Sequence, residues 1–420
     1  MKIAYGTFDA ESLWRPMELA RLPQTGDGAS SIVNAMDELL FAFVGDKDLL
    51  YTRHPFSSTL KDYLSTCGFS FQNAVGEGVE TLRSFMQAAQ DVRTVPYAIT
   101  EQWQVDLGAE TKYPLPALDA VKRVNSKEFS AELADALCCN GFKSVVVHSL
   151  EDLKNYGEHH TEEFLIKDLY GVSGKGMLAV NRPRLLERLI SHLRKQVQAG
   201  KEIAFVCEPR VDKDQDFSTH YLLFPDGSYQ FLSMQKTLNR SFLYKGSYEG
   251  DAEMVDLLDK RGYFDIMRSV MASLHQQGYH GVVGIDSMTT KDGGLVPLVE
   301  INARQSMGLI HHALRKRLLD AGGAGSDILS CYDMGMTADR DENWLFELLG
   351  KSDLLYGKEK RIGVMPVSMN TLFADRHSLY EQVYRGRLYF LSVDNTHTEA
   401  LQGTERFKEL LKENGVTVYG

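Results

Sequence analysis

The sequence predicts a protein of mixed α/β and α+β class, and two patterns carry this prediction. In the first part of the chain, short apolar runs alternate with longer amphipathic segments, which is typical of a small open sheet with helices. Later, two β-type runs over residues 281–291 and 295–302 flank Asp292-Gly293-Gly294, which predicts an antiparallel hairpin. The 420 residues of the chain suffice for two or three domains of roughly 100–200 residues each.

Composition narrows the classes of function. Hydrophobic residues make up 43% and charged residues 25% of the chain, which is ordinary for a soluble globular protein. No apolar run reaches the roughly 18 residues that span a bilayer, and the start of the chain lacks a signal-peptide profile. The formal net charge of −11 argues against binding nucleic acid or a membrane surface. The five cysteines form no Cys-x-x-Cys pair, which indicates reduced thiols in a cytoplasmic protein.

Residues 1–122 are expected to form an amino-terminal α/β domain. Prolines at positions 96, 114 and 116 interrupt the pattern and predict a boundary region. The expected elements are strands over residues 1–8 and 39–45 and helices over 57–67 and 80–90.

A second unit is expected over residues 123–200. Ser126 is a typical N-cap for the helix that follows it. The expected elements are a helix over residues 127–139, strands over 142–148 and 163–167, and a helix that ends at Gly200.

Residues 201–335 are expected to form a third unit that contains the hairpin, and residues 336–420 a small carboxy-terminal extension. The turn residues Asp226-Gly227 predict a second hairpin. The expected elements are strands over residues 203–207, 220–224 and 229–233, one long helix over 252–277, a strand over 361–369 and a helix over 402–414.

The hairpin predicts a metal site. If the turn pairs Lys291 with Leu295, counting outward places Asp286 directly opposite Glu300. Asn302 shares a face with Glu300 because side chains alternate along a strand, so three oxygen donors meet at cross-strand distances of roughly 5 Å. Carboxylates this close repel one another unless a cation lies between them, and Mg²⁺ prefers such oxygens. The alternative is a surface charge pair with nearby lysine or arginine.

A glycine-rich turn follows the predicted strand that ends at Lys167. Three glycines, at positions 171, 174 and 176, allow backbone N–H groups to fold around phosphate oxygens, and Lys167 adds a positive charge. The segment has neither the Walker A nor the dinucleotide-binding spacing. A flexible connector is the alternative interpretation.

Glu208 and Asp216 flank a polar loop after the next predicted strand. They are suited to accept hydrogen bonds from an amino group and from ribose hydroxyls, and main-chain groups at the end of that strand are suited to pair with a flat heterocycle. A plain acidic loop is the alternative for this segment alone.

Taken in order, Lys127, Lys167 with its glycine turn, Glu208, Asp216 and the 286–304 hairpin resemble the ATP-grasp superfamily, which includes biotin carboxylase and D-alanine–D-alanine ligase. The resemblance covers roughly residues 123–320. Glu300-Ile-Asn302-Ala-Arg304 is similar to the family's Glu-x-Asn-x-Arg ending. It implies an ATP-grasp fold with an amino-terminal open α/β domain and a small appended carboxy-terminal subdomain.

The resemblance also implies roles for individual residues. ATP would contact the following positions: Lys127, Lys167, Gly171, Ser173, Gly174, Gly176, Val206, Cys207, Glu208 and Asp216. Mg²⁺, with Mn²⁺ as an alternative, would be held by Asp286, Glu300 and Asn302. Arg304 would stabilise a phosphorylated intermediate and, with Lys167, act in catalysis. Asp216 departs from the family, which more often has Glu or His at this place.

The implied reaction is activation of a carboxylate as an acyl phosphate and its transfer to an amine, which gives an amide or peptide bond. The amino-terminal and carboxy-terminal regions resemble more loosely a subgroup with a pre-ATP-grasp domain, which includes peptide ligases of natural-product pathways and a glutamate–acyl-carrier-protein ligase. A carrier-protein thiol as acceptor and a small-molecule kinase are therefore the alternatives. The expected partners are small-molecule substrates, with an acyl carrier protein and a homodimer left open.

Overall fold

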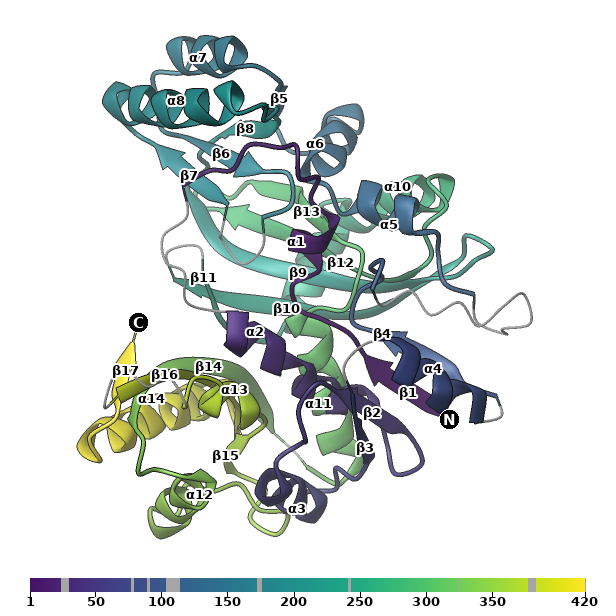
Figure 1. Ribbon diagram of the computed structural model, residues 1–420, viewed down its shortest axis with the longest axis vertical. Helices are drawn as coiled ribbons and strands as arrows, with labels where there is room; N and C mark the ends of the chain where they lie inside the picture. The colour runs from purple at the N-terminus through teal and green to yellow at the C-terminus, as the bar shows by residue number, and fades with distance from the viewer. Residues whose placement is uncertain are drawn as a thin grey trace.

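The computed structural model describes residues 1–23, 30–76, 79–88, 91–102, 114–171, 176–240, 243–323, 325–376 and 383–419. The described strands form three sheets: Figure 1 shows β5–β8 at the top, β9–β17 from the middle to the lower left, and β1–β4 at the lower right. All five cysteines lie in the described residues and are free thiols, as predicted. No described helix has both the length and the apolar composition that crossing a membrane requires.

The first sheet is parallel, with the order β3-β2-β1-β4. Its strands are β1 (Lys2–Tyr5), β2 (Leu49–Thr52), β3 (Gln72–Val75) and β4 (Arg93–Pro96). The helices of this region are α1 (Ala10–Trp14), α2 (Ser30–Ala35), the 3₁₀ helix η1 (Met36–Phe43), α3 (Ser58–Thr66) and α4 (Val79–Ala88).

The strand predicted over residues 39–45 is wrong, because η1 occupies this place. All residues from Met36 to Ala42 are buried, so the apolar run reflects burial on every side of a short helix. A short continuous apolar run does not separate a buried strand from a buried helix.

The second sheet is antiparallel, with the order β5-β8-β6-β7. Its strands are β5 (Val145–Val147), β6 (Phe164–Asp168), β7 (Met177–Val180) and β8 (Phe205–Pro209). The helices α7 (Leu150–His159) and α8 (Pro183–Gln198) pack on one face of the sheet, at the top of Figure 1, around a core of their own. Two further helices, α5 (Leu118–Val124) and α6 (Lys127–Ala136), precede the sheet, and Ser126 caps α6 as predicted.

The third sheet has nine described strands in the order β13-β12-β9-β10-β11-β14-β16-β15, and β17 pairs with β14. Its strands are β9 (Lys213–Leu223), β10 (Tyr229–Arg240), β11 (Leu243–Glu249), β12 (Gly281–Thr290), β13 (Leu295–Asn302), β14 (Ser326–Thr337), β15 (Gly363–Pro366), β16 (Val383–Asp394) and β17 (Thr417–Tyr419). Carboxy-terminal strands therefore continue the sheet that contains the hairpin. The division of the chain into four units remains a prediction.

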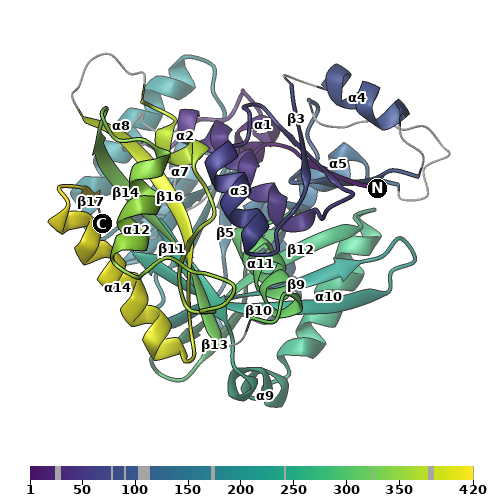
Figure 2. The ribbon, with the colours of Figure 1, turned by 90° about the horizontal axis from the view of Figure 1, so that it is seen from below.

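Helices cover the third sheet, and Figure 2 shows this packing from below. Thr219 of β9 bonds to Tyr263 of α10 at 2.7 Å, and Phe217 packs on the same ring. Alternate β9 residues, including Asp216 and Ser218, therefore point to the opposite face. The helices that follow β11 are α9 (Ala252–Lys260), α10 (Tyr263–Gln276), α11 (Met307–Asp320), α12 (Glu342–Lys351), α13 (Asn370–Phe373) and α14 (His397–Glu413).

The single helix predicted over residues 252–277 is wrong. Gly262 has a φ of +70°, a left-handed conformation that ends α9 and starts α10 in a new direction. The sequence pattern is helical on both sides of this glycine, and an isolated glycine is tolerated within helices, so the break was not evident.

Candidate functional site

The predicted hairpin forms from β12 and β13, and Asp286 lies directly opposite Glu300, as predicted. The side chain of Asn302 donates to Asp286 Oδ2 at 3.0 Å. Asp286 also accepts from Ser218 Oγ of the neighbouring strand β9 at 2.5 Å. The three predicted residues thus lie together on one face of the sheet, with the amide nitrogen of Asn302 toward Asp286 and its oxygen toward Arg304.

The turn of the hairpin differs from the predicted one. Leu295 pairs with Thr289 and not with Lys291, so the turn is longer than expected. A β-bulge then places Ser287 alone opposite three residues of β13, and this restores the expected pairing at Asp286. The predicted pairing of Asp286 with Glu300 is therefore correct because the longer turn and the bulge shift the register in opposite directions.

The environment of Asp286 favours a cation. Burial and the nearby carboxylate of Glu300 raise the pKa of Asp286 to about 6, whereas Ser218 lowers it. Two carboxylates and an amide oxygen match the hard-oxygen ligands of Mg²⁺. Among the described residues no group of three His, Cys, Asp or Glu side chains could hold a metal ion. The cluster has two such residues and needs oxygens from Asn302, water or a nucleotide to complete a metal shell.

Lys127 connects the hairpin to the glycine turn. Its ammonium donates to Glu300 Oε1 at 2.5 Å and to the carbonyl of Gly171 at 2.6 Å. The side chain is nearly buried, with 11% of its surface exposed. The two segments that the sequence analysis assigned to metal and to phosphate are therefore neighbours in space.

The base of the glycine turn is closed by main-chain hydrogen bonds. Asp168 N donates to Gly176 O at 2.7 Å, and Gly171 N donates to Asp168 O at 3.3 Å. Gly176 has a φ of +76°, and a Cβ atom there would lie 3.0 Å from the Cβ of Asp168, so a larger residue at this position would be strained. Ser173 and Gly174 lie outside the described residues.

Lys167 projects from the end of β6 and forms a buried ion pair with Glu208 of β8. Both side chains are about one-tenth exposed. The family resemblance implies that these two residues contact different parts of a nucleotide, whereas the structure brings their charged groups into contact with each other.

The strand that carries Val206 and Cys207 is predicted to end at Cys207, and this prediction is wrong. It continues to Pro209, and both residues lie between the neighbouring strands β5 and β6. Burial raises the pKa of the Cys207 thiol to about 12, so this cysteine is a core residue and not a nucleophile.

Asp216 lies on the same face of the third sheet as Ser218, two residues along β9. It pairs with Lys213 and accepts from Asn239 Nδ2 at 2.8 Å. Its negative charge contributes to the raised pKa of Asp286, so the two carboxyl groups belong to one electrostatic environment.

Arg304 is buried and held by groups from the amino-terminal region. Its Nε donates to Glu11 Oε1 at 2.6 Å, and Nη1 donates to the hydroxyl of Tyr97 at 3.3 Å. Nη2 donates to Asn302 Oδ1 at 2.8 Å, which joins the arginine to the cluster of hairpin residues around Asp286. Glu11 and Tyr97 were not found from sequence, because nothing local links them to residue 304.

The polar and basic side chains of β10 and β11 are only partly available for a ligand. Lys236 pairs with Asp251 and Lys245 with Asp333. Gln235 is fully buried, and neither of its amide atoms has a partner among the described residues. It pairs along the sheet with Ser218, so it points to the face that carries Asp286. An unpaired buried amide is costly unless a ligand or water satisfies it.

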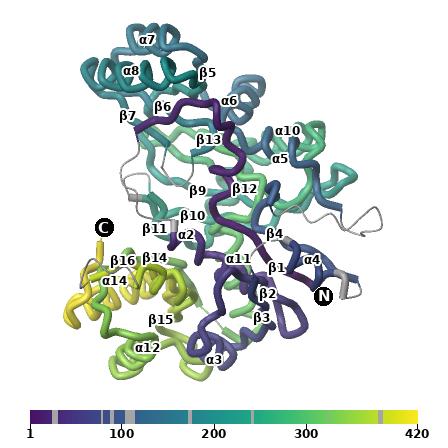
Figure 3. Tube along the Cα trace, viewed as in Figure 1, coloured from purple at the N-terminus to yellow at the C-terminus, as the bar shows by residue number. Residues whose placement is uncertain are grey.

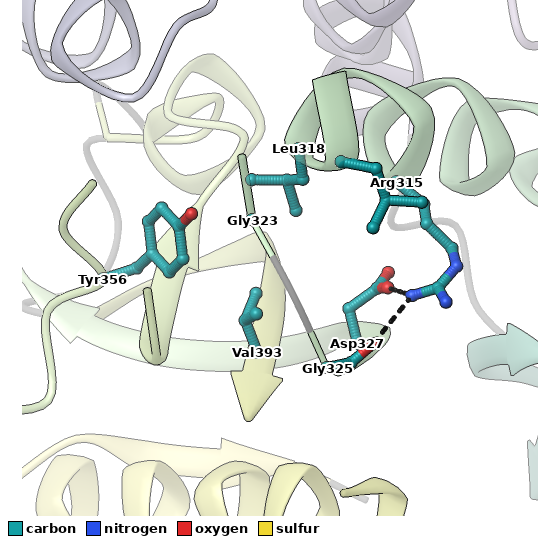
Figure 4. Close-up of a pocket in the computed structure, with 8 residues that line it drawn as sticks. Arg315, Leu318, Gly323, Gly325, Asp327, Tyr356 and Val393 are labelled. Carbon is teal, nitrogen blue, oxygen red and sulfur yellow. Dashed lines mark hydrogen bonds and ion pairs between the residues drawn. The ribbon is translucent and has the colours of Figure 1, made fainter. Parts of the chain in front are cut away.

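A small pocket lies elsewhere, between α11 and the carboxy-terminal strands (Figure 4). The side chains of Arg315 and Asp327 pair on one side of it, and Tyr356 and Val393 lie across from them. None of the predicted site residues lines this pocket. It is a packing gap at the junction of helix and sheet.

Comparison with known proteins gives one sequence relative and many structural ones. No protein-family model matches the chain. The chain is 24% identical over 228 residues to the [butirosin acyl-carrier protein]–L-glutamate ligase of Niallia circulans, and the matched region spans half of each protein.

Solved structures match over nearly the whole chain. N5-carboxyaminoimidazole synthase from Aspergillus clavatus, in complex with ADP and 5-aminoimidazole ribonucleotide, has a TM-score of 0.55 at 11% identity and covers 98% of both chains. The biotin carboxylase domain of 2-oxoglutarate carboxylase from Hydrogenobacter thermophilus, a dimer with MgADP and bicarbonate, has a TM-score of 0.54 at 11% identity and covers 100% of this chain and 90% of its own. At these identities the likeness establishes the fold alone.

Proposed function

We propose that this chain, which has the ATP-grasp fold, is a ligase that uses ATP and Mg²⁺ to activate a carboxylate as an acyl phosphate and to transfer the acyl group to a nucleophile. The observation that carries the proposal is the position of Lys127, whose ammonium contacts both the glycine turn and Glu300. The residues proposed to bind phosphate and the residues proposed to bind Mg²⁺ therefore meet at this lysine. Transfer of a γ-phosphoryl group requires both kinds of group at one place.

The residues of this chain then have distinct roles. Lys127, Lys167, Gly171 and Gly176 would bind the phosphates, and Glu208 would lie at the adenine edge. Asp216 would accept from the ribose. Lys167 and Glu208 form an ion pair, and a bound nucleotide would offer phosphate oxygens to the lysine and the adenine amino group to the carboxylate. Val206 and Cys207 are paired with β5 on one side and β6 on the other, so we do not assign them main-chain contacts to adenine.

Asp286, Glu300 and Asn302 would hold Mg²⁺, which would offset negative charge on the nucleotide phosphates. Arg304 would face the reacting groups and stabilise the negative charge of the acyl phosphate. Glu11 holds the guanidinium in place before substrates arrive, so little reorganisation is needed during the reaction. In this reaction the chain positions and neutralises its substrates, and no protein nucleophile is required.

Two acceptors are in competition. The resemblance of the sequence to ATP-grasp ligases favours an amine, which gives an amide or peptide bond. The relative from Niallia circulans is named for an acyl-carrier protein, and this supports a carrier-protein thiol as the second candidate. A small-molecule kinase on the same fold would differ from both because its phosphorylated product would be stable.

The test measures phosphate release from ATP with panels of amino acids as carboxylates, with and without amines or a phosphopantetheinyl thiol as acceptors. A ligase releases phosphate only when a carboxylate and an acceptor are both present, and hydroxylamine traps its acyl phosphate as a hydroxamate. Mass spectrometry identifies the product as an amide or a thioester. A stable phosphorylated product without an acceptor would replace the ligase by a kinase.

A further inference from the structure

Arg15 follows helix α1 in the amino-terminal region, yet its side chain ends at the base of the glycine turn. Its Nε donates to Asp168 Oδ1 at 3.1 Å and its Nη2 to Asp168 Oδ2 at 3.1 Å, a two-pronged contact between buried groups. The same guanidinium donates to the carbonyls of Leu19 at 3.0 Å and Ala20 at 2.5 Å. The Arg15 guanidinium is thus bound by the Asp168 carboxylate and by main-chain carbonyls of the segment that contains Arg15.

Residues 15–22 form a strap that crosses from the first sheet to the second, and Figure 3 shows it as the purple tube that passes from α1 toward β6 and β7. Ala20 N donates to Glu202 O at 2.8 Å. Gln196 of α8 donates to Arg21 O and accepts from Arg21 N, each at 2.9 Å. Ala20 and Leu22 are buried in the hydrophobic core of the second sheet. The strap is therefore packed on the second sheet although it belongs to the amino-terminal region in sequence.

Asp168 occupies a position from which it orders the turn. Its carboxylate accepts from Tyr170 N at 3.3 Å, while its main chain bonds to Gly171 and Gly176. It also follows Lys167 directly on β6, so a shift of Asp168 moves the adjacent lysine. A buried carboxylate that loses its cation would be driven to protonate or to move toward water.

We propose that Arg15 is a positioning residue for nucleotide binding, which acts through Asp168 to hold the base of the glycine turn. Glu11, one helical turn earlier, holds Arg304 on the opposite side of the same site. The segment that contains Glu11 and Arg15 thus fixes two parts of the site relative to each other: the glycine turn proposed to bind phosphate and the hairpin proposed to bind Mg²⁺. This inference depends on the proposed function, because it assigns the turn to a nucleotide.

The experiment measures the Kd of MgADP by calorimetry for the full chain and its variants. For Arg15→Met we expect a Kd at least tenfold higher than that of the unsubstituted chain. Arg15→Lys keeps the charge but not the two-pronged geometry, and we expect an intermediate increase. Arg21→Ala is the matched control, because Arg21 lies on the same strap and contacts α8 through its main chain; its Kd should not change.

A double-mutant cycle tests the route of the effect. In an Asp168→Asn background, Arg15→Met should change the Kd by less than twofold, because the group through which it acts has lost its charge. Equal tenfold effects in both backgrounds, or a Kd unchanged in folded Arg15→Met and Arg15→Lys, would overturn the inference. If the unsubstituted chain does not bind MgADP, the proposed function itself fails. Thermal unfolding of each variant separates lost binding from lost folding, and Arg15→Lys carries the test if Arg15→Met does not fold.

Discussion

The ammonium of Lys127 lies 2.5 Å from Glu300 Oε1, across 173 positions of sequence. Because the same nitrogen also bonds to Gly171, one side chain connects α6, the glycine turn and the β12–β13 hairpin. Lys127 neutralises a carboxylate of the hairpin. In the proposed function the same ammonium binds phosphate oxygens of the nucleotide.

We expect Lys127→Met to raise the Kd of MgADP by at least tenfold, because a point charge next to the phosphates is lost and Glu300 is left without its partner. Calorimetry measures the affinity and thermal unfolding the stability. Lys122→Met is the control, since Lys122 pairs with Glu101 at the surface. Equal affinities in the two variants would show that Lys127 has only a structural role.

Glu300→Gln should reduce ATP-dependent phosphate release by at least 100-fold while the protein remains folded. The substitution keeps the shape of the side chain but removes a charge that a divalent cation needs. Raising the Mg²⁺ concentration should not restore turnover. Glu253→Gln, at an exposed position of α9, is the control and should have normal activity. Near-normal activity of Glu300→Gln would remove the metal assignment.

Gly176→Ala should weaken MgADP binding by about tenfold. The substitution forces a left-handed φ of +76° on alanine and brings its Cβ to 3.0 Å from that of Asp168. Gly141→Ala provides a matched control, because Gly141 has a φ of +73° and nothing within 4 Å of its Cβ position. Both variants share the backbone strain, so a loss of affinity confined to Gly176→Ala would show that the contact with Asp168 shapes the turn. An equal loss of affinity in the two variants would refute this role of the contact with Asp168.

Local features of the site could be predicted from sequence. The alternation of side chains fixes which of Asp286, Glu300 and Asn302 share a face once the hairpin is recognised. Glycine spacing marks the turn near Gly176, since the left-handed conformation of this residue favours glycine. The bulge at Ser287 was not predictable, because it depends on packing between strands.

The contacts between distant segments could not be predicted from a single sequence. Glu11 reaches Arg304 and Arg15 reaches Asp168 only because the amino-terminal region folds against both other sheets. Nothing in the residues near Arg15 distinguishes it from a surface arginine after a short helix. Without the fold, the sequence does not show which acidic group pairs with Arg15.

The carboxy-terminal region docks on the amino-terminal region through a buried carboxylate. Glu38 of η1 is fully buried and accepts hydrogen bonds of 2.9–3.1 Å from the main-chain N–H groups of Met369, Asn370 and Thr371. Burial raises its pKa from an ordinary value of 4.5 to about 7, although these N–H groups oppose the change. The adjacent Asp37 has a pKa raised to about 7, also through burial.

A raised pKa in the folded state means that the folded chain binds more protons than the unfolded chain between pH 4.5 and about 7. The contribution of Glu38 to the free energy of unfolding is therefore complete below pH 4.5 and is lost as the pH rises through 7. Glu38→Gln cannot titrate, so its destabilisation relative to the unsubstituted chain should shrink by on the order of 2 kcal/mol between pH 5 and pH 8. Urea unfolding at both pH values measures this difference. Glu347→Gln, an exposed carboxylate on α12, should show none. A penalty for Glu38→Gln that is constant with pH would mean that the main-chain N–H groups keep Glu38 ionised, and that the docking of the two regions is insensitive to pH.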